Sequence, residues 1–283
     1  MSIERVFVVG AGTMGGGIAQ AFAQGELEVL LYDEVAEVAA GAVPRMEKGL
    51  AKVVEKGKMT AEEVGAVLGR IQIADELAPA AECQFVIEAI IEDFAVKADL
   101  LAELGGICPP DTILATNTSS LSVTDLGQAG GRPASFVGLH FFNPAPVMKL
   151  VELVVAPQTS SATAETVRNL AIAIGKVPVL VKDSPGFVCN RLLIPMINEA
   201  IVLLEAGVAS AEDIDTTMKL GCGFPMGPLE LSDLIGNDIT LAVMESLRER
   251  LDRAKYQPAR LLEEMVADGR LGRKTGDGFT CDQ

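Results

Sequence analysis

The sequence has few cysteines, and none of them forms a pair typical of zinc sites. Its five cysteines are scattered over 283 residues with no CxxC or CxxH spacing. This pattern excludes a disulfide scaffold and a classical zinc module, and it fits a reducing compartment. A chain of this length buries roughly 75% of its unfolded surface, so it needs no such cross-link. The cysteines are Cys83, Cys108, Cys189, Cys222 and Cys281.

Positive charge is also scarce. The chain carries 23 Lys and Arg against 39 Asp and Glu, which gives a formal net charge of −16 at pH 7. A protein this acidic repels nucleic acid and anionic membranes, so we expect neither as a partner. The hydrophobic share of 49% is ordinary for a globular protein. The length suggests one large domain or two of moderate size.

The sequence has no long apolar run except one uncharged stretch at residues 6–25. This stretch could be taken for a signal peptide, with Ala21 and Ala23 at the cleavage site, or for a short membrane span. Six glycines and two glutamines interrupt it, and Glu4 lies beside Arg5 where a signal peptide is basic. We therefore expect a cytoplasmic protein without a membrane segment.

Short runs of β-branched residues alternate with amphipathic segments up to residue 184, whereas only helical patterns follow. This alternation predicts a mainly parallel sheet of the Rossmann type, followed by a smaller all-helical domain. We expect an α/β domain at 1–184 and a smaller helical domain at 185–283. Strands are expected at 5–9, 28–33, 71–74, 85–89, 113–116, 136–140, 149–155 and 177–181. Helices are expected at 13–24, 36–57, 61–69, 94–105, 161–174, 190–206, 211–220, 229–251 and 258–268.

A glycine-rich turn links the first expected strand to the first expected helix in the pattern G-x-G-x-x-G. Gly10 permits the tight turn, Gly12 lets the backbone approach a pyrophosphate, and Gly15 lets helix and strand pack closely. The helix that opens with Thr13 and Met14 directs its positive end at that pyrophosphate. This combination predicts a dinucleotide site.

The second expected strand ends in a carboxylate, Asp33, 18 residues after Gly15. A carboxylate in this place accepts hydrogen bonds from the adenosine ribose hydroxyls and repels a 2′-phosphate. The expected cofactor is therefore NAD rather than NADP, and no metal is expected.

The single histidine, His140, ends an expected strand, and ligands of such sheets bind at the carboxyl ends of the strands. Imidazole is a suitable base for removing the proton of an alcohol near neutral pH. Glu152 lies within the apolar run 150–155, where an unpaired carboxylate is costly, so it is a candidate partner. A structural histidine with an edge-strand glutamate remains an equal alternative on these residues alone.

Two further polar groups occur where a substrate oxygen could bind. Residues 116–120 follow a strand and offer hydroxyls and an amide, although turn and cap roles explain them equally well. Asn190 begins the long apolar helix, where we expect it to be buried and to need a partner.

A basic stripe is expected along one face of the 36–57 helix, because Arg45, Lys48, Lys52 and Lys56 are three or four positions apart. Lysines on such a face could bind phosphate groups as point charges. A solvated helix face, with Glu47 and Glu55 nearby, is the more general explanation.

Five segments in this order resemble the 3-hydroxyacyl-CoA dehydrogenase family over nearly the whole chain. They are VGAGTMG at 9–15, TNTSSL at 116–121, HFFNPAPVMKLVE at 140–152, SPGFVCNR at 184–191 and MKLGCGFPMGP at 218–228. The resemblance implies an NAD-dependent oxidoreductase that interconverts short-chain (S)-3-hydroxyacyl-CoA and 3-oxoacyl-CoA, such as 3-hydroxybutyryl-CoA and acetoacetyl-CoA. This chemistry serves fatty acid and butyrate metabolism alike. The resemblance also implies a homodimer formed through the helical domain.

The same resemblance implies roles for the polar groups of the chemical site. His140 would be the catalytic base and Glu152 its partner. Ser119 and Asn190 would contact the substrate oxygen. We include Asn143, from the third segment, among the substrate-binding residues.

The resemblance further implies that Asn117, Glu92 and Lys97 lie against the nicotinamide half of NAD. It implies that lysines of the 36–57 helix bind coenzyme A, and we select Lys52 and Lys56. One alternative is a non-catalytic NAD-binding protein of the same fold. Another is a 3-hydroxyisobutyrate-type dehydrogenase, which resembles this architecture but carries a lysine where Gly186 stands here.

Overall fold

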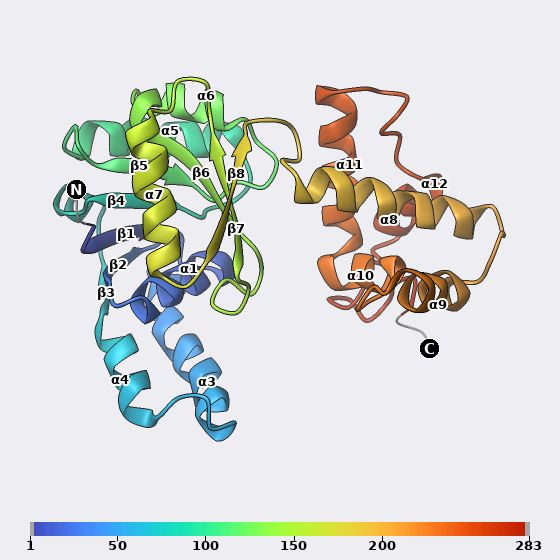
Figure 1. The fold of residues 1–283 in the computed structure, drawn as a ribbon, viewed down its shortest axis with the longest axis horizontal. Helices are drawn as coiled ribbons and strands as arrows, with labels where there is room; N and C mark the ends of the chain where they lie inside the picture. Colours follow the sequence, from blue (N-terminus) through green and yellow to red (C-terminus); the bar gives the residue numbers. More distant parts are fainter. Residues whose placement is uncertain (1–2, 281–283) are drawn as a thin grey trace. The chain divides into compact units, whose positions relative to one another are not determined.

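A computed structural model describes residues 3–280, so Cys281 lies outside the described residues. The chain divides into two compact units, Met1–Asp183 and Ser184–Gln283 (Figure 1). Each unit has its own hydrophobic core. Within residues 3–280, no helix is both long enough and apolar enough to cross a bilayer.

The first unit is built on an eight-stranded sheet with the order β3-β2-β1-β4-β5-β6-β7-β8. Neighbouring strands are parallel except β6 and β7, which are antiparallel. The strands are β1 Arg5–Val9, β2 Glu28–Tyr32, β3 Ile71–Ala74, β4 Phe85–Glu88, β5 Ile113–Thr116, β6 Phe136–Phe141, β7 Leu150–Val155 and β8 Val177–Lys182. The strand order reverses between β1 and β4, and the carboxyl ends of the strands at such a point form the ligand crevice of this fold.

Helices cover both faces of this sheet (Figure 1). The α-helices are α1 Thr13–Gln24, α2 Ala36–Ala40, α3 Ala42–Glu55, α4 Ala61–Gly69, α5 Phe94–Ile107, α6 Val123–Ala129 and α7 Ser161–Ala173. Two short 3₁₀ helices, η1 Ala78–Glu82 and η2 Pro133–Ser135, complete the unit. The mainly parallel sheet expected from the sequence is confirmed.

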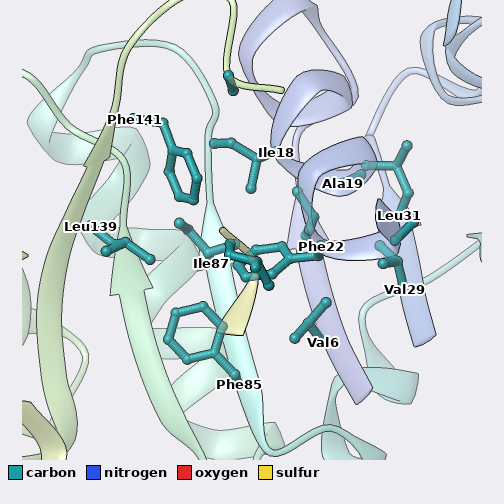
Figure 2. Close-up of a cluster of buried hydrophobic side chains, with 14 of the residues drawn as sticks. Val6, Ile18, Ala19, Phe22, Val29, Leu31, Phe85, Ile87, Leu139 and Phe141 are labelled. Atoms are coloured by element: carbon teal, nitrogen blue, oxygen red, sulfur yellow. The ribbon is translucent and has the colours of Figure 1, made fainter. Parts of the chain in front are cut away.

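The core of the first unit holds α1 against the middle of the sheet (Figure 2). The ring of Phe22 on α1 meets Phe85 of β4 and Phe141 of β6 edge-on, at centroid distances of 5.9 and 6.1 Å. All three side chains are almost completely buried. This packing fixes the start of α1 relative to the carboxyl ends of the central strands.

The second unit contains only helices, as expected. They are α8 Cys189–Glu205, α9 Ala211–Cys222, α10 Pro228–Ile235, α11 Asn237–Arg250 and α12 Arg260–Ala267. Their core gathers around Ile197, Leu229, Leu247 and Leu262, which are fully buried.

Two helices expected to be continuous are interrupted. The segment 36–57 breaks at Gly41, since Pro44 has no N–H to donate to the carbonyl of Ala40. The segment 229–251 breaks at Gly236, whose φ of +108° no right-handed helix accommodates. Helices α6, η1 and η2 were not predicted from the sequence.

Candidate active site

The glycine-rich turn has the geometry that a dinucleotide needs. Gly10 has a φ of +98°, and a Cβ on Gly15 would lie 1.7 Å from the carbonyl oxygen of Gly10. Gly12 precedes α1 without a side-chain cap, and nothing lies within 4 Å of the place of its missing Cβ. The first N–H groups of α1, from Thr13 and Met14 onward, therefore border an open cradle suited to a pyrophosphate.

Asp33 directly follows β2, and its carboxylate is hydrogen-bonded to the glycine-rich turn. One oxygen accepts from the N–H of Ala11 at 2.7 Å and the other from the N–H of Val35 at 3.0 Å. Arg45 donates to the carbonyl oxygen of Ala11 at 2.8 Å. Arg45, an exposed residue of α3, therefore also supports the turn.

A cluster of charged side chains lies at the carboxyl end of β4. The ammonium of Lys97, only 1% exposed, is 2.7 Å from the carboxylate of Glu88 and 3.5 Å from that of Glu92. The hydroxyl of Thr116 also donates to Glu88. Glu88 was not predicted as a site residue, although an acid in the apolar run 85–89 needs a buried partner for the same reason as Glu152.

The 116–120 segment is organised by Glu92. Its carboxylate accepts from the hydroxyl of Thr118 at 2.6 Å and from the N–H groups of Ser119 and Ser120 at 2.8 and 2.9 Å. Burial by itself favours the neutral acid, but the Lys97 ammonium and these hydrogen bonds outweigh it and lower the pKa of Glu92. Glu92 is therefore a carboxylate at neutral pH.

Asn117 joins the ends of three neighbouring strands. Its N–H donates to the carbonyl oxygen of Glu88 at 2.9 Å, and its side-chain oxygen accepts from the N–H of Phe141 at 2.9 Å. The polar ends of β4, β5 and β6 thus form one continuous edge, and the structure brings Glu92, Lys97, Asn117 and Ser119 together there.

His140 and Glu152 lie opposite each other on the antiparallel strands β6 and β7. The Nδ1 atom of His140 is 2.9 Å from Oε2 of Glu152, and the two residues are 7% and 2% exposed. The imidazole ring also lies 4.6 Å from the ring of Phe142, centroid to centroid. The pairing expected between these residues is present, and it fixes which ring nitrogen faces the carboxylate.

The remaining candidates lie on other elements of the chain. Asn143 is exposed in the loop after β6. Asn190 belongs to the helical unit as the second residue of α8, and it is half-buried rather than buried as expected. Lys52 lies on α3, Lys56 follows its last residue, and both are exposed.

Comparison with known proteins confirms the resemblance seen in the motifs. Residues 5–184 match the NAD binding domain of 3-hydroxyacyl-CoA dehydrogenase, and residues 186–281 match the C-terminal domain of that family. The first unit is therefore an NAD-binding domain, as the glycine pattern and Asp33 predict.

Similar proteins match over nearly their whole length. A probable 3-hydroxybutyryl-CoA dehydrogenase of Deinococcus radiodurans is 50% identical over 96% of this chain and 98% of its own. A 3-hydroxybutyryl-CoA dehydrogenase of Clostridioides difficile is 45% identical over 97% of this chain and 98% of its own. The crystal structure of an (S)-3-hydroxybutyryl-CoA dehydrogenase from Ralstonia eutropha superposes with a TM-score of 0.95 at 46% identity, covering 98% of each chain.

Proposed function

The chain belongs to the 3-hydroxyacyl-CoA dehydrogenase family, and we propose that it interconverts (S)-3-hydroxybutyryl-CoA and acetoacetyl-CoA. Bound NAD supplies the hydride acceptor for this reaction. The single observation that carries the proposal is the buried contact between Nδ1 of His140 and Glu152, at the edge of the sheet that also bears the glycine-rich turn. A base held in this way is what alcohol oxidation requires of the protein.

His140 takes the proton of the 3-hydroxyl group and returns it in the reverse direction. Because Nδ1 faces Glu152, the transfer to and from substrate uses Nε2. The carboxylate of Glu152 stabilises the imidazolium that forms and holds the ring in one orientation. Burial of both groups strengthens this interaction relative to water.

Ser119 and Asn190 hold the substrate oxygen as it becomes a carbonyl, and Asn143 contributes a further polar contact. Support for Ser119 comes from Glu92, whose Oε1 accepts a hydrogen bond from the N–H of Ser119 at 2.8 Å. This bond holds Ser119 in place just after the end of β5. Support for Asn190 comes from its half-buried place at the start of α8 and from the SPGFVCNR segment.

Coenzyme A binds through Lys52 and Lys56 in this proposal. Both are exposed on or next to α3, in a chain whose net charge is −16. Lysine ammonium groups on such a face act as point charges for phosphates.

We propose residues 1–184 as the cofactor domain and 185–283 as the substrate and dimerisation domain of a cytoplasmic homodimer. The helical unit supports dimerisation because several of its large apolar side chains are exposed, including Leu192, Val208 and Leu220. Such side chains favour a protein interface where they adjoin one another on the surface. The free thiols of the described residues support a reducing compartment.

Consumption of NADH with acetoacetyl-CoA tests the activity, with a longer 3-oxoacyl-CoA as the comparison. We expect rapid turnover with acetoacetyl-CoA and a lower kcat/KM with the longer thioester. No NADH consumption with either thioester, while NADH still binds, would favour a non-catalytic NAD-binding protein instead.

A further inference from the structure

The charged cluster at the end of β4 contains two carboxylates and one ammonium. Glu88 is 0% exposed and Lys97 is 1% exposed, so neither charge is screened by solvent. The side chain of Glu92 is 36% exposed and lies beside the same ammonium. If all three groups are ionised, the cluster has an excess of one negative charge.

The hydrogen bonds indicate that Glu88 is ionised. Its carboxylate accepts from the ammonium of Lys97 at 2.7 Å and from the N–H of Ile90 at 3.2 Å. The hydroxyl of Thr116 accepts from the N–H of Thr118, which leaves its own hydrogen for Glu88. All three partners therefore donate to Glu88, the pattern that an ionised carboxylate, an acceptor only, needs. Glu92 is ionised as well, because its pKa is lowered.

From the topology, this cluster would lie under one half of a bound dinucleotide. The strand order reverses between β1 and β4, and a dinucleotide lies across that point. Asp33, on the β2 side, marks the adenosine half. The nicotinamide half of a bound dinucleotide would therefore lie over the ends of β4, β5 and β6, on the side of Glu92 and His140. Ala89, next to Glu88, donates to the carbonyl oxygen of Val9 at 2.7 Å, so the cluster adjoins the glycine-rich turn.

We propose that the excess negative charge of the Glu88, Glu92 and Lys97 cluster sets the redox preference of cofactor binding. The oxidised nicotinamide ring carries a positive charge and the reduced ring carries none. The cluster attracts the oxidised ring and leaves the reduced ring almost unaffected. The inference rests on the proposed function in one respect only, the placement of the nicotinamide over β4.

Equilibrium binding of NAD⁺ and NADH to charge variants tests the proposal. Glu92→Gln and Glu88→Gln each remove the excess charge, so each should lower the ratio of NAD⁺ to NADH affinity by roughly tenfold, the effect of one unit charge at about 10 Å in a partly buried site. The double variant Glu88→Gln, Lys97→Met again has one excess negative charge, from Glu92. Its affinity ratio should return to that of the wild type, which no merely structural role would produce.

Asp111→Asn is the matched control, because Asp111 is exposed and precedes β5 at the opposite edge of the sheet. It removes the same charge and should leave the ratio unchanged. An unchanged ratio in Glu92→Gln, with both cofactor forms still bound, overturns the proposal even if Glu88→Gln does not fold. A double variant that folds but keeps the lowered ratio overturns it too. Failure of the wild type to bind either form would instead contradict the proposed function.

Discussion

Glu152 lies directly opposite His140 in the ladder between β7 and β6, and its Oε2 is 2.9 Å from Nδ1 of the imidazole. Residues paired across antiparallel strands bring their side chains together on one face. The register of these two strands therefore sets the distance between the proposed base and its carboxylate. A slip of one residue would turn Glu152 to the other face of the sheet.

Replacing His140 by Ala removes the proposed base without touching the glycine-rich turn. We expect kcat for acetoacetyl-CoA reduction to fall at least ~10²-fold, the usual contribution of a positioned acid or base. The Kd for NADH, measured by fluorescence titration, should change little. Near-native turnover in this variant would show that His140 is not the base.

Glu152→Gln keeps the shape of the partner and removes its charge. A hydrogen bond to an ionised group is about twice as strong as a neutral one, so we expect kcat to fall by roughly tenfold or more. NADH affinity should again stay close to that of the wild type, since Glu152 acts through His140. If kcat is unchanged while circular dichroism shows that the variant is folded, Glu152 has a structural role and none in catalysis.

The strands and the dinucleotide site were largely predictable from the sequence, because their signals are local. Each β-branched run became a strand within a residue or two of its expected ends, and the glycine pattern lies between a strand and a helix. The His140–Glu152 contact could be expected because an acid in an apolar run needs a partner.

Features that depend on distant partners were not predictable in the same way. Glu88 is held by Lys97 and by Thr116, which is 28 positions away in the chain. Asn190 was expected to be buried because its helix is apolar, yet its position at the start of α8 leaves it half-buried. Helix α6, with seven residues, is too short for its periodicity to stand out.

Asp33 contributes both its charge and two hydrogen bonds that hold the backbone of the turn. We expect Asp33→Ala to raise KM for NADH by roughly tenfold or more, since bonds to a charged acceptor are lost. It should also narrow the preference for NADH over NADPH. Asp33→Asn keeps one acceptor without the charge, so it should relieve the repulsion of a 2′-phosphate with less damage to the turn. Equal wild-type kcat/KM with both cofactors would contradict this assignment.

Lys176, only 7% exposed, holds the loop that follows His140. Its ammonium donates to the carbonyl oxygens of Ala145 and Met148 at 2.6 and 2.9 Å, and burial lowers its pKa. The unfolded chain binds this proton more tightly than the folded protein does. The folded state therefore gains stability from this group as pH rises from the lowered pKa towards the ordinary value of 10.5.

Urea unfolding of the wild type and Lys176→Met measures this effect. At about pH 7 the variant should be destabilised by about 1–3 kcal/mol, because the buried carbonyl of Ala145 and the partly buried carbonyl of Met148 lose their donor. The difference in free energy of unfolding between wild type and variant should then grow as pH rises from the lowered pKa of Lys176 towards 10.5. Lys182→Met, an exposed lysine on β8, is the control and should show neither change. A wild-type advantage independent of pH would show that burial of the ammonium does not affect stability.

The double variant Lys52→Ala, Lys56→Ala separates a carrier site from a solvated helix face. If these lysines bind coenzyme A phosphates, KM for acetoacetyl-CoA should rise much more than KM for NADH. The effect should be far smaller with acetoacetyl-pantetheine, which lacks the nucleotide phosphates. Wild-type KM for the thioester should also rise with salt, because exposed charges are screened beyond roughly 10 Å at about 0.1 M.

A second double variant, Arg168→Ala with Lys182→Ala, removes the same charge from exposed residues of α7 and β8 and should leave both KM values unchanged. If the lysines bind the coenzyme A phosphates equally well in the ground state and the transition state, their loss should raise KM and leave kcat unchanged. A large fall in kcat would mean that the phosphate anchor helps to place the 3-hydroxyl group at His140. If KM for the thioester is the same in the Lys52, Lys56 variant and the wild type, the lysines are surface charge and the carrier binds elsewhere.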